Sequence, residues 1–151
     1  MASQRKKTWN WCSKYIRLKE ALEYCGEANI DLRQFVRVED IFGRCCSCGN
    51  IKSWIRMDGG HWIDRGSGGT SGVYFDERNV HLQCKPCNGG LYQGAVKLSV
   101  KENYDNYMLN RYGEDVMTEL KLLDRIHIYR PQDIIGLELY YKQKYQELKE
   151  K

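Results

Sequence analysis

Two pairs of cysteines constrain this chain more than any other feature of its sequence. Each pair has the spacing C-x-x-C, with Cys45 and Cys48 in the first knuckle and Cys84 and Cys87 in the second. Four thiolates arranged in this way are the ligand set of a tetrahedral structural zinc ion. The 35 residues between the knuckles (49 to 83) exceed the loop of a simple zinc ribbon. We therefore predict a zinc-stapled scaffold with a structured insert.

The remaining cysteines are expected to have other roles. Cys46 is a ligand only if the first knuckle is shifted, and the two-residue spacing to Cys48 favours Cys45 instead. Cys12 and Cys25 lie in a predicted helix and are expected to be small buried apolar residues. The N-terminus lacks the apolar run of a secretory signal, so we expect a cytoplasmic protein whose thiols are reduced. That compartment favours metal binding over disulfides.

Length and composition set wider limits on the protein class. A chain of 151 residues is long enough for one domain with its own core. Because no stretch approaches the ~20 apolar residues of a membrane span, we expect no membrane partner. The net charge of +4 permits a polyanionic partner. Six basic residues against one acidic residue in positions 1–20 fit either a solvated helix face or phosphate contacts.

Hydrophobic periodicity predicts a helix at each end of the chain and short strands between them. Apolar residues recur at helical spacing from Thr8 to Tyr24, whereas residues 27–44 are compatible with a strand near Phe35 or with a helical turn over 34–42. Strands are expected at 53–57, 61–65 and 74–83, with the glycine-rich residues 66–72 as a hairpin loop or a phosphate-wrapping loop. Helices are expected at 101–112, 114–125 and 131 to about 149.

These elements predict a single α+β domain over residues 1–151. Its parts are an N-terminal helix (8–26), a zinc-bound ββα-metal core (45–100) and C-terminal helices (101–151). The apolar stripe of the last helix, which includes Ile134 and Tyr141, packs either on the core of the same chain or at a subunit interface.

The insert between the knuckles carries polar residues suited to phosphodiester hydrolysis. A neutral histidine can take a proton from water near pH 7, and His61 at the start of a predicted strand is the candidate general base. The amide oxygen of Asn88, beside Cys87, suits a hard cation such as Mg²⁺ or Mn²⁺. Asp58 is either a further metal ligand or part of an ordinary D-G-G turn.

Two more residues complete the predicted site. Asn79 is expected to fix the loop that carries His61 through hydrogen bonds to its backbone. Arg65 lies on the same face of the predicted strand as His61 and is a candidate for holding the scissile phosphate, although an exposed arginine is commonly just solvated. His81 and His127 lack a comparable setting, and we assign them no functional role.

The residues quoted above resemble those of the phage NinG family, the Rap recombination endonucleases. The resemblance covers most of residues 11–123 and includes the motif YIRL at 15–18, both knuckles, Gly60-His61-Trp62 and the run NVHLQCKPCN at 79–88. The chain is also similar to the phage endonuclease VII group of junction resolvases, whose knuckle likewise leads into a metal-binding helix. These resemblances imply an HNH, or His-Me finger, nuclease that cuts branched DNA such as Holliday junctions and D-loops.

One position departs from the usual HNH pattern. Many HNH enzymes have Asp or His immediately before the base, where this chain has Gly60, so one metal ligand is missing and Asn88 becomes the main one. The run from Asp58 to His61 fits the Asp-x-Gly-His pattern of nonspecific nucleases in the same superfamily. Symmetric cuts across a junction require two active sites, so we expect a homodimer. The alternatives are a general HNH nuclease and a non-catalytic zinc module that binds nucleic acid.

Overall fold

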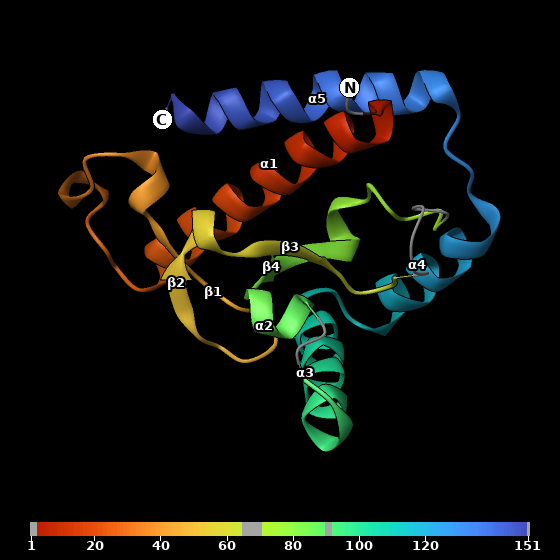
Figure 1. The fold of residues 1–151 in the computed structure, drawn as a ribbon, viewed down its shortest axis with the longest axis horizontal. Helices are drawn as coiled ribbons and strands as arrows, with labels where there is room; N and C mark the ends of the chain where they lie inside the picture. The colour runs from red at the N-terminus through yellow and green to blue at the C-terminus, as the bar shows by residue number, and fades with distance from the viewer. Residues whose placement is uncertain (1–2, 65–70, 90–91, 151) are drawn as a thin grey trace.

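Two long helices from opposite ends of the chain pack against each other on one side of the molecule (Figure 1). The computed structural model describes residues 3–64, 71–89 and 92–150. Helix α1 (Gln4–Glu27) and helix α5 (Pro131–Lys149) are joined by apolar contacts and by a hydrogen bond from the Thr8 hydroxyl to the Ile134 carbonyl. Tyr141 of α5 is buried in this contact. The sequence left two partners open for the last helix, and the structure shows that it packs on the core of the same chain.

The helix predicted from Thr8 is confirmed but begins earlier. Ser3 caps α1 by accepting a hydrogen bond from the Lys6 amide, and Thr8 is buried with its hydroxyl engaged by α5. The helix also ends later than predicted. It continues through Gly26 to Glu27, and the chain turns at Asn29, whose φ is +55°. Residues 32–40 form two single turns of 3-10 helix, Leu32–Gln34 and Val38–Asp40, so no strand forms near Phe35.

Four short strands in residues 3–64, 71–89 and 92–150 form two antiparallel pairs. Strand β1 (Phe42–Arg44) pairs with β2 (Ile51–Ser53), and β3 (Asp58–His61) pairs with β4 (Val80–Gln83) so that His61 lies opposite Val80 and Asp58 opposite Gln83. The structure is therefore α+β, as predicted, with much more helix than strand. None of the helices in the described residues is long and apolar enough to cross a membrane.

The strand positions predicted from the sequence were partly wrong. Residues 54–56 form a 3-10 turn, because the buried Trp54 directs its indole N–H to the Val38 carbonyl and bends the chain. Strand β3 starts at Asp58, so the D-G-G run is strand and not turn; a Cβ on Gly59 would lie 3.0 Å from the Ser13 hydroxyl of α1. Of the strand expected over 74–83 only β4 forms, since Asp76 caps another 3-10 turn (Glu77–Asn79).

The later helices follow the prediction closely. A single turn, α2 (Lys85–Asn88), leads to α3 (Gly94–Tyr112), which begins earlier than the expected residue 101 and projects away from the body of the molecule (Figure 1). Helix α4 (Glu114–Ile126) then packs back against α3. Gly113, with φ of +89°, separates the two helices, which is a backbone conformation that favours glycine.

A buried ion pair connects α1 to strand β4. The Glu20 carboxylate lies 2.7 Å from His81 Nδ1 and also accepts the Leu82 amide at 2.8 Å. His81 Nε2 lies 2.9 Å from the Arg78 carbonyl, which can only accept a hydrogen bond, so Nε2 carries a proton. Burial by itself raises the pKa of Glu20, but His81 and the Leu82 amide lower it below its ordinary value. His81 is thus a structural residue.

Candidate functional site

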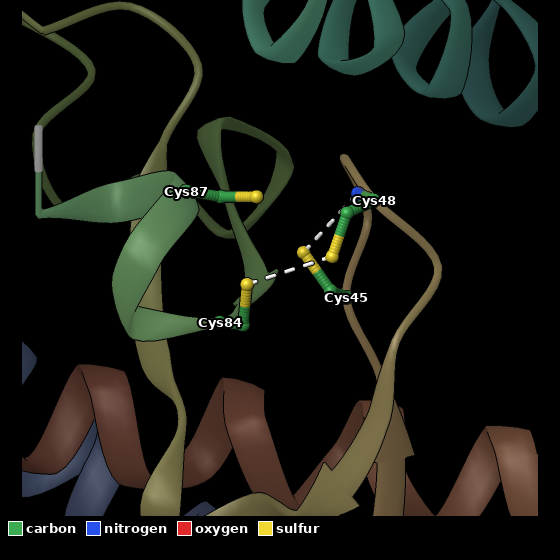
Figure 2. A group of neighbouring side chains, drawn as sticks. All are labelled: Cys45, Cys48, Cys84 and Cys87. Atoms are coloured by element: carbon green, nitrogen blue, oxygen red, sulfur yellow. Dashed lines mark hydrogen bonds between the residues drawn. The ribbon is translucent and has the colours of Figure 1, made fainter. Parts of the chain in front are cut away.

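The four predicted cysteine ligands converge on one point, with their sulfurs directed toward one another (Figure 2). All four Sγ atoms lie within 4.8 Å of one another, and those of Cys48 and Cys84 are 3.5 Å apart. A tetrahedral zinc ion with Zn–S bonds of about 2.3 Å places its sulfurs about 3.8 Å apart. The cluster therefore fits zinc, with two ligands from the turn after β1 and two that bracket the start of α2.

The surroundings of these sulfurs favour thiolates bound to a cation. The amides of Ser47 and Cys48 each donate to Cys45 Sγ at 3.4 Å. Burial raises the pKa of the Cys45 thiol, but these amides and that of Cys84 outweigh burial and lower it. Burial and the adjacent sulfurs raise the pKa of Cys84 and Cys87. Four thiols this close cannot all lose their protons unless a cation compensates the negative charge.

The other three cysteines lie outside the cluster. Cys12 and Cys25 are completely buried in α1, as predicted. The Cys46 sulfur faces the Ser47 hydroxyl at 3.9 Å, and burial raises the pKa of its thiol well above the ordinary value. Cys46 is therefore a neutral thiol beside the cluster.

A cleft of about 850 Å³ lies between strand β3, helix α2 and the projecting helix α3. It brings together two of the predicted site residues, His61 and Asn88. Asp58 lies beside this cleft, where its carboxylate accepts hydrogen bonds from Lys85 Nζ at 2.7 Å and Asn88 Nδ2 at 3.1 Å. Arg65 and residues 66–70 fall outside the described residues. Because β3 ends at His61, strand alternation does not extend to Arg65 and cannot be used to place it.

His61 is held in one orientation by groups that sequence reasoning did not identify. Its Nε2 lies 2.9 Å from the Tyr74 carbonyl, so Nε2 carries the proton and, in the neutral ring, Nδ1 carries the lone pair. The indole of Trp9, in α1, stacks on the imidazole with ring centroids 4.5 Å apart. Burial lowers the pKa of His61, although the Tyr74 carbonyl and Asp64 oppose this shift. The ring is consequently neutral near pH 7.

Asn79 makes hydrogen bonds to the segment that follows His61. Its Oδ1 accepts the Ile63 amide at 2.8 Å, and its Nδ2 donates to the carbonyls of Ile63 and Val73, both at 3.1 Å. The side chain is completely buried. Asn79 thus acts on the backbone and lies away from the open cleft.

Several residues of the cleft were missed by the sequence analysis. Tyr104 of α3 is buried and donates its hydroxyl hydrogen to the Gly60 carbonyl at 2.6 Å, which links α3 to the strand that carries His61. Asp64, Lys97 and Lys101 line the same cleft. Their sequence positions gave no signal, because isolated charged residues outside a motif are usually only solvated.

Comparison with known proteins identifies the family of this chain. The family model described as "Bacteriophage Lambda NinG protein" matches residues 1–151. The chain belongs to the NinG family. It is 27% identical over 134 residues to Protein ninG of Escherichia phage 933W, covering 89% of this chain and 62% of that relative. The corresponding proteins of Escherichia phage lambda and Salmonella phage P22 are 25% and 26% identical over 89% of this chain, which covers 61% and 62% of their lengths.

This NinG chain thus spans about three fifths of the length of the curated relatives it matches. No solved structure matches it significantly. The name of these relatives, Protein ninG, states no activity. Family membership therefore identifies a phage protein, and the function has to be argued from the site.

We predict that zinc binding depends on Cys87 and not on Cys46. Purified chain should contain about one zinc ion per molecule, and Cys87→Ser should lose most of it together with thermal stability, because three sulfurs no longer close the tetrahedral site. Cys46→Ser is the matched control and should keep its zinc. Metal analysis by mass spectrometry with a melting curve tests this, and full zinc content in Cys87→Ser would contradict the assignment.

Proposed function

We propose that this protein is a metal-dependent endonuclease of the HNH, or ββα-metal, type that acts on branched DNA. The observation that carries the proposal is that Asn88 lines the same cleft as a neutral His61 held by the Tyr74 carbonyl. Strands β3 and β4 followed by α2 give the order β-β-α, and the cysteine cluster fixes the start of α2. This arrangement supports an HNH assignment although α2 is only a single turn.

The residues of the cleft suit hydrolysis of a phosphodiester. His61 Nδ1, which carries the lone pair, takes the proton of an attacking water. The oxygen donors that line the cleft, the Asn88 amide and the Asp64 carboxylate, fit a hard divalent ion such as Mg²⁺ or Mn²⁺. Such an ion supplies positive charge beside the phosphate when bound. Lys97 and Lys101 add positive charge on the α3 side of the cleft.

Branched DNA is the substrate class that the resemblance to recombination endonucleases and junction resolvases supports. The mildly basic chain, with a net charge of +4, is compatible with a nucleic-acid partner. Two cuts in one junction require two active sites, which supports a homodimer. Ile135 and Leu139, on the side of α5 away from α1, are 49% and 64% exposed and offer an apolar surface for a second copy.

Cleavage of a labelled four-way junction tests the proposed function. With Mg²⁺ or Mn²⁺ the protein should cut the junction in preference to linear duplex and single strands, and His61→Ala should lower the rate by about 10²- to 10⁴-fold. The mutant should keep its zinc. His127→Ala, an exposed histidine outside the cleft, is the control and should cleave normally. Binding without cleavage under every metal would instead support a zinc-dependent nucleic-acid-binding module, and equal cutting of linear duplex a general nuclease.

The cleavage rate should fall only at acidic pH. Protonated His61 cannot accept a proton, so activity is lost as the pH falls through the pKa of this residue in the folded protein. Because burial lowers that pKa from its ordinary value of 6.5, half-maximal activity should lie below pH 6.5. A pH–rate profile at saturating metal measures this, and a midpoint above pH 6.5 would contradict the environment described for His61.

The protein should be a dimer when it acts on a junction. Sedimentation velocity at micromolar concentration is expected to show two copies, alone or on junction DNA, with Leu139→Lys shifting the protein toward monomer by placing a charge on the apolar surface. A monomer under both conditions would count against the homodimer.

A further inference from the structure

The side chain of Gln83 occupies the space that a side chain at position 60 would need. A Cβ atom added to Gly60 would lie only 1.9 Å from Gln83 Oε1. Gly60 immediately precedes His61 on β3, and Gln83 is the last residue of the neighbouring strand β4. The Gln83 amide oxygen thus lies in the space that a side chain at position 60 would enter.

The two ends of the Gln83 amide have different environments. Its Nε2 donates a hydrogen bond to the Ser47 hydroxyl at 2.9 Å. Within the described part of the chain, no group donates a hydrogen bond to its Oε1. Gln83 is only 4% exposed, yet it lines the cleft together with His61 and Asn88. An amide oxygen at a cleft wall that accepts no hydrogen bond from the described residues is a candidate ligand atom.

The position of Gln83 relative to the cysteine cluster strengthens this interpretation. Gln83 precedes Cys84, and Asn88 follows Cys87, so the second knuckle has an amide side chain on each flank. Ser47, which holds the Gln83 amide, belongs to the first knuckle. Both residues are thus next to a cysteine of the cluster, and both line the cleft of His61.

We infer that Gln83 Oε1 is a ligand of the divalent cation in this cleft, alongside Asn88, and takes the place of the ligand missing at Gly60. The inference rests on the proposed function, which requires such a cation. Amide oxygens are suitable ligands for Mg²⁺ and Mn²⁺, and their lack of charge gives weaker binding than carboxylates. Gln83 is consequently a catalytic residue through its contact with the metal.

Binding of Mn²⁺ to the zinc-loaded chain, followed by electron paramagnetic resonance, tests this role without any cleavage reaction. Gln83→Leu keeps the bulk but removes the oxygen, and should weaken Mn²⁺ binding by roughly 10-fold or more. Gln83→Glu should strengthen it. Gln143→Leu, on the exposed surface of α5, is the matched control and should bind Mn²⁺ as the unchanged protein does. Zinc content and circular dichroism should be the same in all four proteins.

A reciprocal exchange provides an independent test. Gly60→Asp alone should disrupt the β3–β4 pair, because its Cβ would collide with Gln83. Gly60→Asp combined with Gln83→Ala removes the collision and returns an oxygen ligand to the same space. The double variant should therefore recover the Mn²⁺ affinity that Gln83→Ala alone loses. Lack of recovery in a folded, zinc-containing double variant would contradict the exchange.

The results separate this inference from the proposed function. Equal Mn²⁺ affinity in Gln83→Leu and the unchanged protein, together with metal-dependent cleavage by both, would overturn the role of Gln83 and leave the nuclease intact. A protein that neither binds Mn²⁺ nor cleaves any DNA would overturn both.

Discussion

The crowding of four thiols at one point is the constraint on which the rest of this structure depends. Sulfurs within 4.8 Å of one another repel once they are ionised, and only a bound cation makes that arrangement favourable. A zinc ion held there would fix the turn after β1 to the start of α2, two segments far apart in the chain. Gln83 and Asn88 flank the second knuckle, so the same ion would hold the backbone on both sides of it.

Helix α1 is the second element that holds the paired strands in place. Its Glu20 makes the buried ion pair with His81 of β4, and its Trp9 stacks on His61 at the end of β3. Burying two charges is costly unless each has good hydrogen-bond partners, which Leu82 and Arg78 provide. The paired strands, too short to be stable alone, are thus held between α1 on one side and the cysteine cluster on the other.

The sequence predicts the features that depend on local spacing and misses those that depend on tertiary contact. The cysteine spacing identified the cluster, and apolar periodicity identified α1, α4 and α5. The glycines at 59 and 60 suggested a turn, whereas the structure places them in strand β3. Ser13 and Gln83 approach these two positions closely. The sequence pointed to Asn88 because this residue directly follows the second knuckle. It did not point to Gln83, because a polar residue at the end of a strand has no distinctive pattern. The hydrogen-bond partner of Gln83 is Ser47, 36 residues earlier.

The packing of α1 against α5 also has a consequence for the order in which the protein is made. Strands β3 and β4 and both knuckles leave the ribosome before α5, the last helix described. The cysteine cluster can therefore close while α1 still exposes the apolar side that α5 later covers. Trp9 lies on that same helix and packs in one apolar cluster with Ile134 and Tyr141 of α5. A chain interrupted before α5 would therefore leave this apolar side of α1 open to solvent.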